Sequence, residues 1–298
     1  NIPAVMAEVR NESYAQYAWP RPLALAFQRN GTILSLAIAL CLSLVLFLSI
    51  VLNSTTNFFG AHGTHPESFY EIIPLPVMQA VGLVTFVFSL LALAMGARNF
   101  WRDAGPRNNV TLPALGIALW DVLTLKNLGG GGNGCNDNSE AFSMRRRYLH
   151  HAMFYGFLLC FAATLTGYIY HSFLDWPAPY PLLSLPVVLG TVGGIALIIG
   201  SIGLIVMRFA DDPMPNVARV RGGDIALLML LALIAITGLV LLAVRATDAM
   251  GLAMSIHLGF ILAFFVMLPY SKMVHGVYRS AALLRRAVER NMKPLGTE

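Results

Sequence analysis

The sequence predicts an all-α integral membrane protein, a six-helix bundle with both termini in the cytoplasm. Three observations lead to this prediction. The chain of 298 residues is 57% hydrophobic and only 12% charged, whereas soluble domains average about 45–50% apolar and about 25% charged residues. Six apolar blocks are long enough to cross a bilayer, which takes about 20 helical residues. The basic residues gather on one side of these blocks.

The six expected spans contain no Asp or Glu in their interiors. They are Thr32–Leu52, Val77–Ala97, Tyr148–Phe173, Leu185–Met207, Ile225–Val244 and Ala249–Met273. They divide the chain into a cytoplasmic N-terminal segment (1–31), a membrane domain (32–275) that contains a long cytoplasmic loop (98–147), and a basic, helical, cytoplasmic C-terminal segment (276–298).

The positive charges set the expected orientation. Of the 20 lysines and arginines, all except Arg245 fall on the same side of the six blocks. Short loops rich in Lys and Arg stay in the cytoplasm, so we expect a multi-pass protein of the bacterial cytoplasmic (inner) membrane. The net charge of +5 is explained by these flanks, and we expect the lipid bilayer rather than nucleic acid as a partner.

Two segments of the long cytoplasmic loop carry recognisable patterns. Thr111–Leu125 is expected to be a short helix that begins at a Thr111 cap and either lies on the inner membrane face or packs against the bundle ends. The stretch Leu128–Glu140, "LGGGGNGCNDNSE", lacks the Lys and the preceding strand of a phosphate-binding loop. It is either a flexible linker or a floor beside the membrane site on which a partner docks.

Five of the seven histidines lie in or at the edges of the third and sixth spans. They are His150, His151, His171, His257 and His275. Ionisable side chains at membrane depth are costly and usually mark function. His62 and His65 lie in a polar outer loop, and we expect them to be surface residues.

The spacing of the histidines predicts two pairs. His257 and His275 are eighteen residues apart, which is about five turns of a straight helix, so they share one face. His150 and His171 are three heptads apart and share a face in a supercoiled bundle. Because the two spans run antiparallel, His150 is expected to meet His275 near the inner surface and His171 to meet His257 near the outer one.

Two histidine pairs at two depths predict one or two b-type haems, because imidazole is a common axial ligand of haem iron. The expected iron ligands are His150, His171, His257 and His275, with His151 as the alternative inner ligand. Pro269 lies between His257 and His275 and can kink that helix. The competing interpretation is that these histidines only hydrogen-bond the helices together.

Three stretches resemble the membrane part of the tricarballylate (citrate) utilization protein B family. They are "GGGGNGCNDNSEAFSMRRRYLHHAMFYGFLLCF", "WPAPYPLLSLPVVLGTVGG" and "LPYSKMVHGVYRSAALLRRAVER". The resemblance implies a membrane electron-transfer cytochrome whose partner is an FAD-dependent dehydrogenase that oxidises a tricarboxylate. The histidine spacing is also similar in arrangement to that of the dihaem membrane subunit of nitrate reductase.

The family's cysteine-rich iron–sulfur motifs are missing from this sequence. Each cluster needs about four cysteines, which Cys41, Cys135 and Cys160 cannot supply. The chain opens "NIPAVMAEVRNE", without Met or a signal pattern. We therefore expect the iron–sulfur clusters on a region that precedes this sequence or on a separate subunit.

The predicted function is electron transfer from a flavoprotein, through an iron–sulfur relay and haem, to membrane quinone. Tyr270 and Lys272 lie beside the expected inner pair and are candidate quinone contacts. The alternatives are a small-molecule membrane transporter and a non-catalytic anchor with structural histidines. The absence of Asp or Glu inside a span and of a clear inverted repeat argues against proton-coupled transport.

Overall fold

The computed structural model describes residues 2–29, 31–53, 55–63, 65–104, 109–132, 134, 141–210 and 218–292. Within these ranges the chain is helical and forms no strand. Six helices are long and apolar enough to cross a membrane, which confirms the predicted all-α, six-span class, and the cytoplasmic location of the termini stays a prediction. They are α3 (Gly31–Val51), α5 (Leu75–Asp103), α7 (Arg145–Leu174), α8 (Leu185–Ala210), α9 (Ala218–Val244) and α10 (Met250–Met267).

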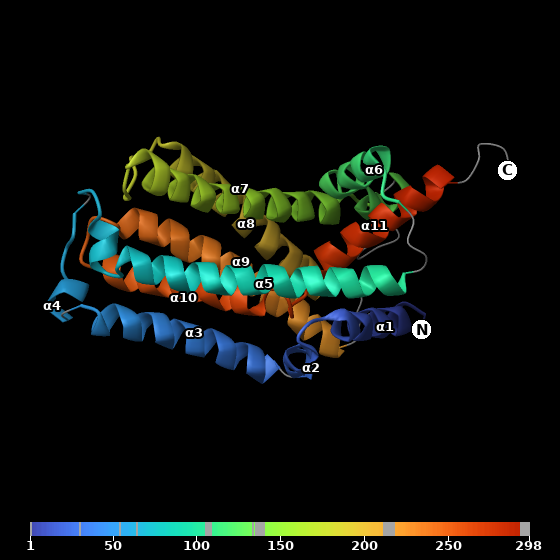
Figure 1. Ribbon diagram of the computed structural model, residues 1–298, viewed down its shortest axis with the longest axis horizontal. Coiled ribbons are helices and arrows are strands. Elements are labelled where there is room, and N and C mark those ends of the chain that lie inside the picture. Colours follow the sequence, from blue (N-terminus) through green and yellow to red (C-terminus); the bar gives the residue numbers. More distant parts are fainter. Residues whose placement is uncertain are drawn as a thin grey trace.

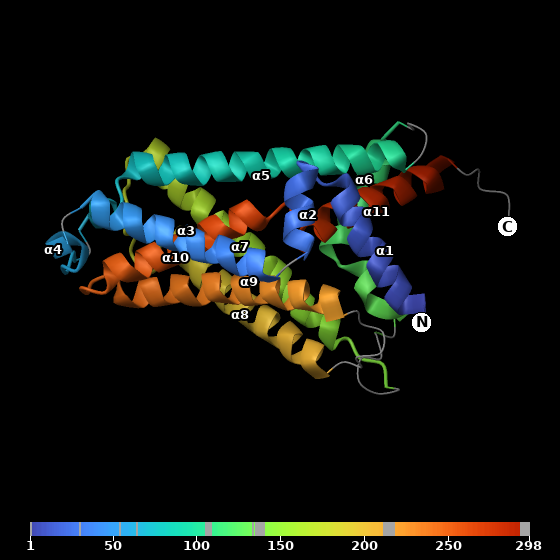
Figure 2. The same ribbon diagram turned by 90° about the horizontal axis from the view of Figure 1, so that it is seen from below.

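The six spanning helices run side by side along the long axis, and the remaining longer helices gather at one end (Figure 1). The helices at that end are α1 (Ile2–Tyr17), α2 (Arg21–Arg29), α6 (Leu112–Leu123) and α11 (Val274–Met292). Figure 2 shows α1 and α2 crossing the bundle at a steep angle to the spans. At the opposite end lie the short α4 (Thr55–Phe58) and η1 (Ser68–Glu71).

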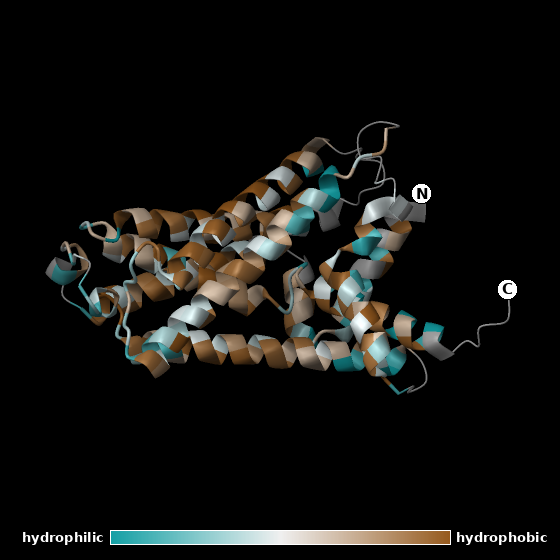
Figure 3. Ribbon diagram, turned by 90° about the horizontal axis from the view of Figure 1, so that it is seen from above, coloured by the Kyte–Doolittle hydropathy of each residue, from teal (hydrophilic) through white to brown (hydrophobic). Residues whose placement is uncertain are grey.

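Apolar side chains cover the outside of the spans, as a lipid-facing surface requires. On α3, for example, Leu36, Leu40 and Phe47 are exposed at intervals that keep them on one face. Figure 3 shows hydrophobic colouring along the spans and hydrophilic colouring concentrated at the two ends. The most buried span is α10, which packs against α3, α5 and α9 and therefore forms the centre of the bundle.

The most extensive contact between two helices is that of α7 with α8. It depends on glycines, because small residues allow the backbones of membrane helices to approach one another. A Cβ on Gly156 or Gly193 would approach the facing backbone within 3.0 Å, and one on Gly200 would overlap the backbone of Met153. The third and fourth spans are therefore locked together along much of their length.

The sixth span is shorter than predicted. Helix α10 ends at Met267, and the chain turns through Leu268–Met273 before α11 begins at Val274. Pro269 explains the break, because proline has no backbone N–H and clashes with the carbonyl four residues earlier. The straight-helix argument that placed His257 and His275 on one face was therefore wrong, and His275 belongs to α11.

Helix α6 forms as its sequence predicts, and the structure shows which of its faces is covered. Thr111 caps it as predicted, accepting a hydrogen bond from the backbone N–H of Ala114 at 3.4 Å. Its alanine face packs on α11, where Ala114 and Ala118 are buried against Ala287 and Val288. The leucine stripe does not make that contact: Leu112, Leu115 and Leu119 are exposed.

The α7–α8 interface yields a stability prediction. Gly200→Ala places a methyl group on the Met153 backbone, and overpacking of this kind typically costs about 1–3 kcal/mol. Gly82→Ala on α5 is the matched control, because a Cβ there meets nothing within 4 Å. We expect Gly200→Ala, but not Gly82→Ala, to lower the melting temperature in detergent. Equal melting temperatures would show that the close approach is not needed.

Candidate functional site

The structure brings His150 and His275 together at the end of the bundle that carries α6 and α11. His150 lies in the second turn of α7 and His275 at the start of α11. Their ring centroids are 6.3 Å apart and the ring planes are inclined by 69°. The predicted inner pair therefore exists, although the helix break, rather than a straight span, positions His275.

His275 is held as a neutral imidazole with one nitrogen available. Its Nδ1 donates to the carbonyl oxygen of Lys272 at 2.5 Å, which leaves the Nε2 lone pair free. Burial lowers the pKa of His275 to about 4, and the nearby Arg279 lowers the pKa further in the same direction. A ligating histidine almost always donates its other ring N–H to an oxygen acceptor in this way.

His150, rather than His151, lines a cavity between α7 and α11. The buried Nδ1 of His150 has no hydrogen-bond partner in the described part of the chain. His151 instead donates from Nε2 to the carbonyl oxygen of Thr124 at 3.1 Å and stacks on Tyr155. Of the two alternatives for the inner ligand, the geometry favours His150.

The cavity between these helices has a volume of about 490 Å³. Its inner wall is apolar, with Met153, Phe157 and Leu231 among the lining residues. Two basic side chains of α11, Arg279 and Arg286, also line it and are exposed. The cavity therefore combines two facing imidazoles, an apolar wall and two cations.

Sequence reasoning missed the two arginines, although a signal was present. His275, Arg279 and Arg286 are separated by four and then seven residues, which places all three on one face of a helix. From the sequence alone, the two arginines count only toward the basic C-terminal segment (276–298).

The glycine stretch begins at this cavity. Asn127 and Leu128 line it, at the start of η2 (Lys126–Gly132). Gly130 and Gly132 have φ angles of 53° and 121°, which favour glycine. A Cβ on Gly129 would lie 3.2 Å from the guanidinium of Arg147, so the stretch also packs against α7. Residues 133 and 135–140, including Cys135, lie outside the described residues.

The turn between α10 and α11 is tied to α8 and α9 by one carboxylate. Asp224, on α9, forms ion pairs with Arg208 of α8 and with Lys272 of the turn. The distance from Lys272 Nζ to Asp224 Oδ1 is 2.6 Å. The phenol of Tyr270 donates to the carbonyl oxygen of Trp19 at 3.3 Å. Both candidate quinone contacts at this turn thus have structural partners.

The outer histidines have separate surroundings. The Nδ1 of His171 lies 3.3 Å from the phenol oxygen of Tyr70, and the two rings pack edge to face. The Nδ1 of His257 lies 3.1 Å from the hydroxyl of Thr237 on α9. Because the described contacts of each ring are with other residues, the pairing of His171 with His257 stays a prediction.

The first outer loop differs from expectation at one of its two histidines. His65 is exposed, as predicted, but His62 is buried. Both ring nitrogens of His62 are engaged, by Glu71 and by the carbonyl oxygen of Asn57, each at 2.7 Å. These two hydrogen bonds hold the loop that carries His62 against Asn57 and Glu71.

No group of three or more metal-ligating side chains occurs in the part of the chain that the structure describes.

Comparison with known proteins places these features in a family. The family model for citrate utilization protein B matches residues 26–295. A citrate utilization protein B of Escherichia coli is 41% identical over 295 residues, covering 97% of this chain and 76% of that protein. No solved structure matches.

The Asp224 network yields a stability prediction. Asp224→Asn keeps the shape but removes the charge that holds Lys272 and Arg208, and hydrogen bonds to charged groups contribute about 1.5–3 kcal/mol each. We expect a lower melting temperature in detergent. Glu289→Gln is the control: Glu289 is exposed and pairs with the buried Arg285 four residues earlier in the same helix, and glutamine keeps an acceptor for that arginine, so its loss of stability should be clearly the smaller of the two. An Asp224→Asn protein as stable as the control would contradict this role.

Proposed function

This chain belongs to the citrate utilization protein B family, and on that premise we propose that it is a b-type cytochrome of the inner membrane. In this proposal the chain carries electrons from an FAD-dependent dehydrogenase, through an iron–sulfur relay and haem, to membrane quinone. It thereby supports the oxidation of citrate or tricarballylate by its partner. The chain itself is an electron carrier, and the dehydrogenase is a separate protein.

The facing pair of His150 and His275 carries the proposal. Their ring centroids are 6.3 Å apart, and the two imidazoles would hold the iron of a haem between them, as histidine side chains do in many haem proteins. The Nε2 of His275 is free to ligate because its Nδ1 donates to Lys272. The buried Nδ1 of His150, which has no hydrogen-bond partner in the described residues, is also explained if that nitrogen contacts a group that is bound in the cavity.

The cavity's other residues suit the rest of the haem group. Haem is a flat apolar ring with two carboxylate side chains, and Met153, Phe157 and Leu231 offer an apolar wall for the ring. Arg279 and Arg286 are exposed on the same cavity and would pair with the two carboxylates, because arginine binds carboxylates with two parallel hydrogen bonds.

Bound haem supplies one-electron chemistry, and the chain supplies ligation, burial and orientation, which tune the potential. The proposal requires only one haem, held by His150 and His275. The proposal does not include the second haem that the sequence predicts between His171 and His257. His151 has a hydrogen-bonding role at Thr124 in this account.

Electron entry is proposed at the end of the bundle that carries α6, α11 and the glycine stretch. The basic residues cluster at that end, which is the cytoplasmic side by the positive-inside tendency. The iron–sulfur relay is proposed on a partner or on another region. The two described cysteines, Cys41 and Cys160, lie on different spans, where they cannot form a cluster site. The glycine stretch begins beside the cavity, and it is the proposed docking surface for the iron–sulfur relay.

The ligand assignment is tested by substitution. His150→Ala and His275→Ala should each abolish or strongly reduce the b-type absorbance, because each removes one axial ligand. His151→Ala is the matched control and should keep its haem. The measurement is a reduced-minus-oxidised visible spectrum of purified protein, with haem counted per chain.

Two outcomes would change the account. Loss of haem in His151→Ala with retention in His150→Ala would exchange the roles of the two neighbours. A wild-type protein that holds no haem in membranes from haem-replete cells would contradict the cytochrome function, and transport assays would then test the alternative.

The docking role of the glycine stretch gives a separate prediction. Deleting Gly129–Gly132 should slow haem reduction by the reduced flavoprotein system while leaving haem content and reduction by dithionite unchanged. Loss of haem content together with electron entry would instead indicate that the stretch only shapes the cavity.

A further inference from the structure

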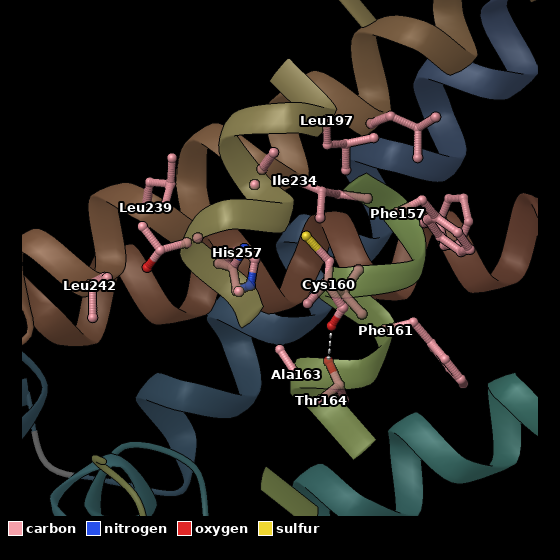
Figure 4. Close-up of a pocket in the computed structure, with 18 of the residues that line it drawn as sticks. Phe157, Cys160, Phe161, Ala163, Thr164, Leu197, Ile234, Leu239, Leu242 and His257 are labelled. Atoms are coloured by element: carbon pink, nitrogen blue, oxygen red, sulfur yellow. Dashed lines mark hydrogen bonds between the residues drawn. The ribbon is translucent and has the colours of Figure 1, made fainter. Parts of the chain in front are cut away.

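A second cavity lies deeper in the bundle, between α7, α8, α9 and α10 (Figure 4). Its volume is about 270 Å³, roughly half that of the His150–His275 cavity. His257 lines it from the middle of α10, seven residues after Met250 and ten before Met267. The cavity is therefore set near the middle of the membrane-spanning part.

The lining is apolar and aromatic apart from a few polar groups. Phe157, Phe161 and Phe264 contribute rings. The hydroxyl of Thr164 donates to the carbonyl oxygen of Cys160 at 3.2 Å, an interaction drawn in Figure 4. Small-molecule sites typically combine such an apolar lining with a small number of placed polar groups, and His257 is the strongest hydrogen-bonding group here.

The hydrogen bonds of His257 define what it offers. The hydroxyl of Thr237 donates to the carbonyl oxygen of Leu233 at 2.7 Å, so its oxygen accepts a hydrogen bond from the Nδ1–H of His257 at 3.1 Å. In this tautomer the Nε2 is an acceptor. An acceptor left without a donor in apolar surroundings is costly, so the cavity suits a ligand that carries a hydroxyl group.

The two cavities share a wall. Phe157 of α7 and Leu231 of α9 line both of them. A ligand beside His257 would therefore contact two of the residues that also contact the contents of the His150–His275 cavity, and electron exchange between two bound groups requires such proximity.

The cavity also reaches the surface of the bundle. Phe161 and Thr164 line it and are exposed on α7, within a span whose outer surface faces lipid. A ligand dissolved in the bilayer can enter from that side without passing through water.

We propose that this cavity binds the ring of a lipid-soluble quinone, in its reduced form, with one ring hydroxyl donating to the Nε2 of His257. The proposal rests on the cytochrome function and places its quinone site. An acyl chain would fill the space but would leave His257 without a donor. A haem here would need a second axial ligand, and the ring of His171 packs against Tyr70.

Three variants and one control separate these possibilities. His257→Leu removes the acceptor, His257→Gln supplies another acceptor, and Ala163→Leu fills the cavity without touching His257. His65→Ala, at an exposed histidine of the outer loop, is the control. The probe is a radiolabelled benzoquinol with a ten-carbon tail, kept reduced without oxygen. Its binding to purified protein is measured by scintillation proximity, beside the haem spectrum of each variant.

We expect saturable binding near one quinol per wild-type chain and unchanged binding in His65→Ala. His257→Leu loses one hydrogen bond to the quinol, which should weaken quinol affinity about tenfold. His257→Gln should restore most of that affinity, because its side chain again offers an acceptor. Ala163→Leu should abolish binding, and all four variants should keep the wild-type haem content.

Equal quinol binding in wild type, His257→Leu and Ala163→Leu, or no saturable binding to wild type, would overturn the proposal. Loss of haem in His257→Leu would also overturn it, because His257 would then be an iron ligand. A wild-type protein without haem that still binds quinol through His257 would contradict the cytochrome function and leave this binding site standing.

Discussion

Pro269 ends α10 before it can carry His275, and the inner site depends on that break. The turn that follows presents the Lys272 carbonyl to the Nδ1 of His275 and the Lys272 ammonium to Asp224. The chain then leaves along α11, which is packed on α6 through small side chains. The helix break at Pro269 thus determines three features. It places the carbonyl that fixes the tautomer of His275, it sets the direction of α11, and it positions Arg279 and Arg286 on the cavity.

The membrane architecture was predictable because lipid imposes a simple rule. Each span must satisfy its own backbone hydrogen bonds and cover its outer face with apolar side chains, and both requirements are visible in the order of residues. The meeting of His150 with His275 also followed from antiparallel spans. The geometry behind that prediction was wrong, since it assumed a straight helix through Pro269.

Other features could not be read from the sequence because they depend on contacts between distant segments. His150 and His151 are neighbours in the sequence, and only tertiary contacts distinguish them: His151 donates to Thr124, whereas His150 lines the cavity. Tyr70 lies about a hundred residues before His171, and Thr237 reaches His257 from another helix. A polar loop gave no sign that His62 would be buried between Asn57 and Glu71. Two cavities that share Phe157 emerge only when α7, α9, α10 and α11 are assembled.

The central claim is that His150 and His275 together hold one haem iron. Near-infrared magnetic circular dichroism of the oxidised wild-type protein tests it most directly, because the position of the charge-transfer band identifies the pair of axial ligands. If His150 and His275 hold the iron, the oxidised protein will show a low-spin ferric haem with two imidazole ligands, and this signal will be lost in His275→Ala. A high-spin haem, a different ligand pair, or an unchanged bis-imidazole signal in His275→Ala would contradict it.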